Sequence, residues 1–195
     1  MNRREVLKGL GLSLGYIIAT PTILSMLQSC TAEAEQWTPQ FFSKKQGLVL
    51  QKLVDIIIPK TEGIAGALDV NVPQFMDLYI SKTASEEDKK FYKTGLDAVM
   101  NALGILNGEA VVLSTDHFET LLSKYLRITR AQRLVYITED NLVFKTLTTL
   151  RDQTVWSYLS SKEIGENVLA YSPVPGQQIG CITLEEATGG RAWSL

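Results

Sequence analysis

Residues 43–59 read SKKQGLVLQKLVDIIIP, and the pattern of this stretch recurs through most of the chain. Its apolar residues return every three or four positions between Val49 and Ile57, which is the period of a helix that buries one face. Ser43 is a residue type that caps helix N-termini, and Pro59 stops the pattern because proline cannot continue a helix. The stretch therefore predicts an amphipathic helix that ends just before the proline.

The same period predicts four further helical segments, and residues 60–72 between them predict a loop. The segments are a short one from Pro73 through Ile80, one after Ser85, one after Ser114, and one from Arg130 to about Leu159 for which a division near Asp140-Asn141 is one option. The side chains expected to be buried are Phe75, Met76, Tyr79, Ile80, Phe91, Leu96, Val99, Leu103, Phe118, Leu121, Leu122, Tyr125, Leu134, Ile137, Leu142, Leu147, Leu150 and Trp156. No stretch alternates with period two for long. We therefore expect an all-α fold, a small bundle of about five to six helices with a long irregular C-terminal tail.

Composition narrows the class of protein before any motif is considered. The chain has 195 residues, of which 45% are hydrophobic and 21% charged, a balance typical of globular domains. Its net charge of −2 provides no basic surplus for nucleic-acid binding. One histidine, His117, and two cysteines, Cys30 and Cys181, disfavour multi-histidine zinc sites, iron–sulfur clusters and disulfide-stapled minidomains.

The motifs of common active sites are missing from the sequence. There is no phosphate-binding glycine loop, dinucleotide fingerprint, CxxC or HExxH. His117 stands in the first turn of an expected helix, where a surface or capping role is favoured over that of a general base. We therefore expect no catalytic, cofactor-binding or metal-binding residues in this chain, and no enzymatic activity of its own.

The first 30 residues have the layout of an export signal. Arg3 and Arg4 precede a moderately apolar run, which is typical of a twin-arginine leader. Residues 27–30 read LQSC and resemble a bacterial lipobox, which predicts that Cys30 is acylated and begins the mature chain. An uncleaved N-terminal membrane helix is the alternative, although glycines, prolines and hydroxyl residues interrupt the run.

The remaining chain divides into three expected parts. Residues 30–40 are polar and predict a tether, residues 41–160 predict the helical domain, and residues 161–195 predict an extended docking tail. The tail is rich in glycine and proline and is too long to be an ordinary connection. It either wraps over its own domain or docks on another protein.

Cys181 in this tail has four possible states. In an exported protein whose other cysteine is acylated, it forms an inter-chain disulfide or it is a reactive thiol. A buried, inert cysteine is the alternative, and a bond to Cys30 would exclude acylation.

Two blocks of residues carry a resemblance to a known family. Residues 171–176 (YSPVPG), Gly180-Cys181 and residues 188–194 (TGGRAWS) resemble the C-terminal signature of the gluconate 2-dehydrogenase subunit 3 family, the small, gamma-type subunit of membrane-associated dehydrogenases. Residues 53–59 (LVDIIIP), followed by Gly66-Ala67 and residues 72–75 (VPQF), are similar to the first block of that family. The twin-arginine leader is also typical of it.

The resemblance implies a non-catalytic accessory subunit. Its partner would be a large FAD-dependent dehydrogenase of the glucose–methanol–choline type, often joined by a cytochrome c subunit with haem c. The chain would escort the folded flavoprotein through the twin-arginine pathway, stabilise it, and anchor it at the periplasmic side of a membrane by lipid on Cys30. An independent carbohydrate-binding lipoprotein is the alternative. The residues expected to dock on the partner are Tyr171, Pro173, Pro175, Gly176, Cys181, Arg191 and Trp193.

Overall fold

The helices of this protein begin where the sequence places capping residues. A computed structural model describes residues 37–105, 114–174, 176 and 180–194. Ser43 and Gln46 form a capping box at the start of α2, and Thr129 and Gln132 form another at the start of α6. The helices are α2 (Lys44–Ile57), α3 (Val72–Thr83), α4 (Glu86–Ala102), α5 (Thr115–Leu126), α6 (Arg130–Thr138), α7 (Leu142–Leu159), α8 (Lys162–Asn167) and α9 (Leu184–Thr188).

These elements confirm the all-α fold that the sequence predicts. Ser85 and Ser114 are N-caps as well, and the long segment does divide in two. The division lies at Asp140, whose backbone adopts the left-handed region with φ of 53°, a conformation that aspartate tolerates better than most residues. Six of the described helices, α2 to α7, account for the predicted bundle of five to six.

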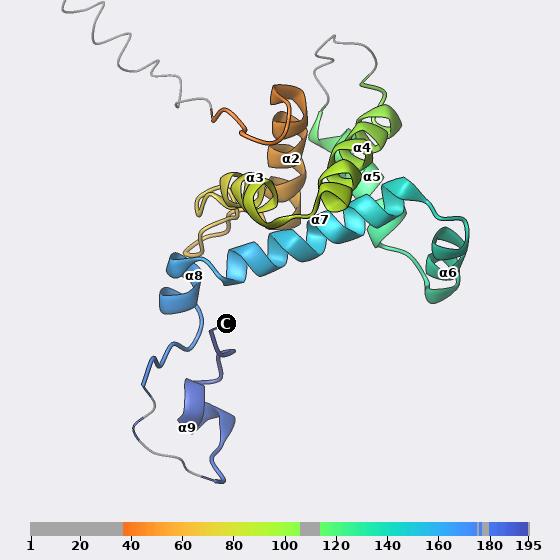
Figure 1. Cartoon of the computed structure of the whole chain (residues 1–195). Helices are drawn as coiled ribbons and strands as arrows, with labels where there is room; N and C mark the ends of the chain where they lie inside the picture. The colour runs from red at the N-terminus through yellow and green to blue at the C-terminus, as the bar shows by residue number, and fades with distance from the viewer. Residues whose placement is uncertain (1–36, 106–113, 175, 177–179, 195) are drawn as a thin grey trace, which may run out of the picture. The chain divides into compact units, whose positions relative to one another are not determined.

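Helix α7 lies at the centre of the bundle. It packs against α2, α3, α4, α5 and α8, and Figure 1 shows it running across the bundle from α8 toward α6. Two of its inward residues are threonines, Thr146 and Thr154, which are fully buried. Their hydroxyls donate to carbonyls one turn earlier in the same helix, at 2.8 and 2.7 Å, so both threonine hydroxyls have a partner. The apolar core around them contains Leu50, Leu53, Met76, Ile80, Leu96, Val99, Leu147 and Leu150.

The loop between α2 and α3 is held by backbone contacts. Gly66 has no room for a side chain, because a Cβ there would lie 2.5 Å from the Lys60 amide nitrogen. The carboxylate of Asp69 accepts the amide of Gly66 at 2.8 Å and contacts the Lys60 ammonium at 3.1 Å. The Gly66 amide, and then Lys60, lower the pKa of Asp69. Gly66, which belongs to the first family block, and its partners Lys60 and Asp69 therefore hold the loop in shape.

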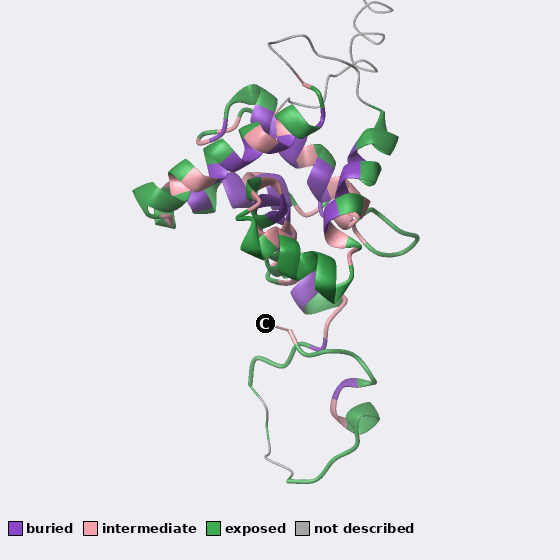
Figure 2. Cartoon of the chain, turned by 90° about the vertical axis from the view of Figure 1, so that its right-hand side faces the viewer, coloured by how far each residue is buried: buried purple, intermediate pink, exposed green. Residues whose placement is uncertain are grey.

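The C-terminal tail contains more structure than its glycines and prolines predict. It includes the short helices α8 and α9, and Ile164 of α8 is buried. Ala170 exchanges backbone hydrogen bonds with Ala192 and Ser194 at 2.8 and 2.9 Å, so residues 171–192 form a closed loop. Figure 2 shows most of this loop in the colour of exposed residues. The tail is long and irregular as expected, and backbone hydrogen bonds join the two ends of this loop.

Candidate interaction surface

Three aromatic rings gather on the outside of α3 and α7. Phe75 and Tyr79 lie one turn apart on α3, and Trp156 comes from α7. The ring centroids are 5.8 Å apart for Phe75–Tyr79, 5.7 Å for Phe75–Trp156 and 5.2 Å for Tyr79–Trp156. The exposed fractions of these residues are 42%, 38% and 40%. We call Phe75, Tyr79 and Trp156 the aromatic patch.

The aromatic patch corrects an expectation, because all three residues were predicted to be in the core. On α3 the inward positions are taken by Met76, Asp77 and Ile80. Asp77 faces inward because its carboxylate accepts three backbone amides, and this turns the two aromatic residues to the flank. On α7 the buried residues of the same region are Thr154 and Ser157.

The chemistry of the patch suits recognition of another protein. Aromatic residues are enriched at the centre of protein interfaces. They bury a large area there and lose little side-chain entropy, because they have few rotamers. Leu78 and Val155 are exposed close by in sequence, at 43% and 39%. A shallow hollow of about 360 Å³ adjoins the patch and is lined by Tyr79, Thr149, Asp152, Gln153 and Trp156.

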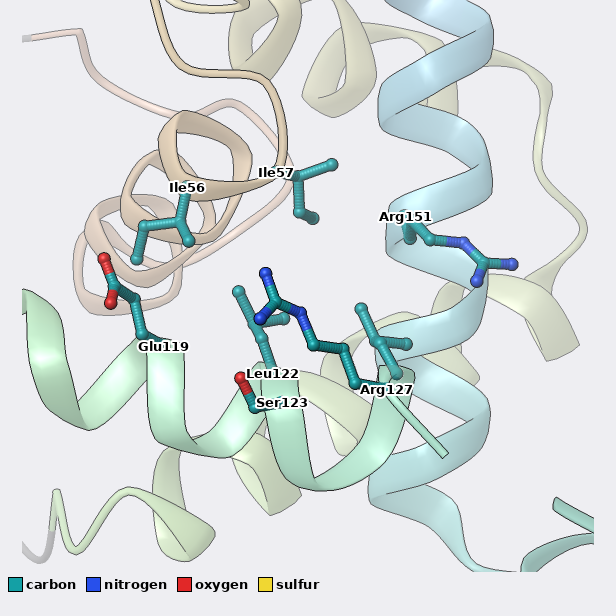
Figure 3. Close-up of a pocket in the computed structure, with 8 residues that line it drawn as sticks. Ile56, Ile57, Glu119, Leu122, Ser123, Arg127 and Arg151 are labelled. Carbon is teal, nitrogen blue, oxygen red and sulfur yellow. The ribbon is translucent and has the colours of Figure 1, made fainter. Parts of the chain in front are cut away.

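A second pocket, of about 380 Å³, lies where α2, α5 and α7 meet. Figure 3 shows Arg127 of the α5 C-cap pointing toward Ile56 and Ile57 of α2, whereas the guanidinium of Arg151 points away from them. Arg151 donates instead to its neighbour Asp152 at 2.7 Å. The lining residues described contain one carboxylate, Glu119, and no histidine or cysteine. Such a set has no pairing of nucleophile and base.

His117 lies at the start of α5 and is exposed. Its Nδ1 is 2.9 Å from the Ser114 hydroxyl at the helix N-cap. This position agrees with the surface or capping interpretation of the sequence. Among the residues that the structure describes, no group of three or more histidine, cysteine or carboxylate side chains is arranged to hold a metal ion.

The expected docking residues lie on the surface of the tail. Tyr171 and Trp193 are each 53% exposed. Cys181 is an exposed free thiol, so the alternative of a buried, inert cysteine is wrong. Pro173, Gly176 and Arg191 are also exposed, and Pro175 lies outside the described residues.

Arg3, Arg4 and Cys30 also lie outside the described residues, so the export and acylation expectations stay predictions. Within the described part, no helix combines the length and apolarity needed to cross a bilayer.

Sequence reasoning missed the buried position of Asp77. The signal was available, because Asp77 is the one acidic residue of α3 and stands between apolar positions.

Comparison with protein families gives one match. A family model described as Gluconate 2-dehydrogenase subunit 3 matches residues 44–176, more than half of the chain. The matched part runs from the start of α2 into the tail and contains the whole aromatic patch. Searches among curated proteins and among solved structures returned no match.

Proposed function

Because this chain belongs to the gluconate 2-dehydrogenase subunit 3 family, we propose that it is the non-catalytic subunit that escorts, stabilises and anchors an FAD-dependent sugar or sugar-acid dehydrogenase. The family match over residues 44–176 is the observation that carries the proposal, since the family is named as a subunit of a dehydrogenase. The partner is a flavoprotein of the glucose–methanol–choline type, with a cytochrome c as a third subunit. The redox chemistry then belongs to the FAD and the haem of the partners.

The aromatic patch and the exposed tail are the proposed docking surfaces. The patch offers three rings in mutual contact, each two-fifths exposed, and burial of such rings is the usual source of strong affinity at an interface. The loop of residues 171–192 adds exposed backbone and side chains that a partner can cover. A standard interface buries roughly 1,600 Å² in total, which a patch and a loop of this size can share with a partner.

The docking role is tested by two paired substitutions in the full chain, co-expressed with the flavoprotein subunit. Tyr79→Ala with Trp156→Ala removes two hot-spot candidates and is expected to weaken the complex by roughly thirtyfold or more. Leu48→Ala with Leu68→Ala is the matched control, because both leucines are exposed outside the patch and the tail, at 53% and 39%. The flavin absorbance that co-purifies with the tagged chain measures how much flavoprotein stays bound. Equal retention by the patch variant and the control would exclude the patch as the docking site.

The escort role is tested at the twin-arginine pair. A flavoprotein that loads FAD in the cytoplasm must cross the membrane folded, and the twin-arginine route carries folded cargo. Arg3→Lys with Arg4→Lys is expected to leave the flavoprotein subunit in the cytoplasm, as measured by dehydrogenase activity in the two fractions. Full periplasmic yield with this variant would contradict the escort role.

The anchoring role is tested separately at Cys30. Cys30→Ser is expected to move the exported complex from the membrane fraction to the soluble periplasmic fraction without lowering its activity, because acyl chains supply the attachment. An unchanged membrane fraction would contradict the anchor. A chain that binds a monosaccharide and no flavoprotein would favour the alternative of an independent carbohydrate-binding lipoprotein.

Cys181 is the proposed site of a covalent link to the partner. With Cys30 acylated, the exposure of Cys181 leaves the inter-chain disulfide and the free reactive thiol as the two open states. Non-reducing electrophoresis of the purified complex distinguishes them. A band at the summed mass that disappears in Cys181→Ser is the result expected of the disulfide.

A further inference from the structure

Helix α6 differs from the other helices of the bundle in how little it buries. No residue of α6 is buried, although its capping box is complete. Its inner side rests on one ring, that of Tyr136, whose centroid lies 5.3 Å from Tyr125 and 5.4 Å from Phe144. Figure 1 shows α6 at the end of the bundle, joined to α5 and α7 by its flanking turns. The helix therefore presents most of its surface to the surroundings.

A flank of α6, centred about 110° around the helix axis from Tyr136, carries both basic and apolar residues. Leu134 and Ile137 are 58% and 51% exposed. At about 100° per residue, Arg130, Arg133, Leu134 and Ile137 fall within an arc of about 100°. We call these four residues the basic–apolar face. Together with Ile128 and Thr129 they line a hollow of about 510 Å³.

The arginines of this face carry unopposed positive charge. Among the described residues, no carboxylate lies within ion-pair distance of Arg130, Arg133 or the adjacent exposed Arg127. The whole chain, in contrast, has a net charge of −2. The face is thus a local positive region on an acidic protein, and its charge is complementary to an anionic surface.

We propose that the basic–apolar face of α6 binds the anionic surface of a lipid bilayer. Arginine stems are apolar and long, so their guanidinium groups can reach lipid phosphates while Leu134 and Ile137 enter the boundary of the acyl chains. The interleaving of the two residue types on one face matches an interface in which phosphate and hydrocarbon layers lie side by side. The inference rests on the proposed attachment of the chain to a membrane, which keeps α6 close to lipid and raises its effective concentration there.

The test measures amide hydrogen exchange in the full chain with vesicles of phosphatidylcholine alone and with vesicles that also contain phosphatidylglycerol. Anionic vesicles are expected to slow exchange in residues 130–138, and zwitterionic vesicles are not. Arg130→Gln with Arg133→Gln is expected to reduce this protection by roughly thirtyfold. Each basic residue near an anionic surface strengthens binding by about fivefold, and the variant removes two of them. Leu134→Ser with Ile137→Ser is expected to abolish it.

The matched control is Lys82→Gln with Lys162→Gln, which removes the same charge from two exposed positions outside α6. This control is expected to keep the protection. Protection that persists in the arginine variant, or that the two vesicle types produce equally, would overturn the inference. Protection of α6 by the flavoprotein subunit but not by anionic vesicles would also overturn it and assign the face to a protein.

The lipid anchor is read independently in the same samples. Flotation with zwitterionic vesicles measures attachment by the lipid on Cys30 without a contribution from α6. The α6 variants are therefore expected to leave it unchanged. A chain that floats without protection of α6 contradicts the basic–apolar face and leaves the anchor standing. A chain that does not float with zwitterionic vesicles but shows α6 protection with anionic ones contradicts the anchor and supports the face.

Discussion

The carboxylate of Asp77 holds the segment before α2 against α3. Asp77 is 1% exposed, and its two oxygens accept the backbone amides of Gln40, Phe41 and Phe42 at 2.7, 3.1 and 3.0 Å. Three backbone amides that donate to this carboxylate offset the free-energy cost of burying its charge. This contact joins residues 40–42, which precede α2, to α3, 35 to 37 residues later, and determines which side of α3 faces the core.

The first prediction concerns this carboxylate. Asp77→Asn keeps the shape of the side chain but replaces one acceptor with a donor that faces a backbone amide. We expect a loss of about 2–3 kcal/mol in the free energy of unfolding, because hydrogen bonds to charged groups contribute about that much. Urea denaturation measures the loss. Asp152→Asn is the control, since Asp152 is exposed and is expected to change stability by less than about 1 kcal/mol. Equal effects from the two variants would contradict the role of Asp77.

The second prediction concerns pH. The hydroxyl of Tyr158 donates to the Ala65 carbonyl at 2.6 Å, and burial, followed by the charge of Asp69, raises the pKa of Tyr158 above 10.0. Because the folded pKa is raised, the stabilisation is complete below the unfolded pKa and is lost as pH rises through the folded pKa. Tyr158→Phe is expected to cost about 1 kcal/mol at pH 7 and to make the alkaline fall in stability less steep. Urea unfolding from neutral pH to above 10 checks both effects, and an unchanged alkaline slope would contradict the assignment.

At the scale of elements, the sequence predicts where the helices start and that each has an apolar face. It predicts only in part which residues of each helix face the core. On α5 the expected residues Phe118, Leu121, Leu122 and Tyr125 are all buried. On α4 the expected Phe91 is half-buried and its neighbour Tyr92 is buried instead. On the long segment Leu147 and Leu150 are buried as expected, whereas Leu134, Ile137, Leu142 and Trp156 are exposed. The difference arises because apolar residues outnumber the inward positions, and polar ones such as Thr146 and Asp77 take some of those positions.

The close approach of α4 and α7 leads to the third prediction. A Cβ at Gly95 would lie 2.2 Å from Oγ1 and 3.0 Å from Cγ2 of Thr146. Thr146 is fully buried and cannot swing into solvent. Gly95→Ala is therefore expected to destabilise by about 1–3 kcal/mol, although alanine favours a helix by about 1 kcal/mol over glycine.

Thermal unfolding measures this effect, and adding Thr146→Ala is expected to recover part of the loss because the two clashing atoms are removed. Thr94→Ala, on the exposed side of the same helix, serves as the control and is expected to keep or slightly raise the stability. Wild-type stability in Gly95→Ala would show that the two helices can move apart without cost.

At the scale of the whole molecule, the bundle and the tail loop differ in what they bury. The bundle holds the core, whereas the described residues between Tyr171 and Ile182 are all exposed. Limited proteolysis with thermolysin is therefore expected to cut first within 171–182 and to change the free energy of unfolding of the bundle by less than about 0.5 kcal/mol. Mass spectrometry locates the cut. An initial cut within α2 to α7, or a large loss of stability after cleavage of the tail, would contradict this division.

Binding of the flavoprotein subunit provides a second measurement on the same loop. If the tail docks as proposed, the complex is expected to resist cleavage within 171–182 under conditions that cut the free chain. Equal cleavage in the two samples would leave the aromatic patch as the remaining docking candidate.

The sequence by itself determined the helices of the bundle, their starts and the family, because capping, period and local motifs depend on residues a few positions apart. It also indicated the absence of common catalytic motifs, since those are short. Only the tertiary structure revealed the inward position of Asp77, the exposed aromatic patch and the outer face of α6. Each of these depends on which of several apolar residues meets a neighbouring helix, and that choice is made by packing between residues far apart in the chain.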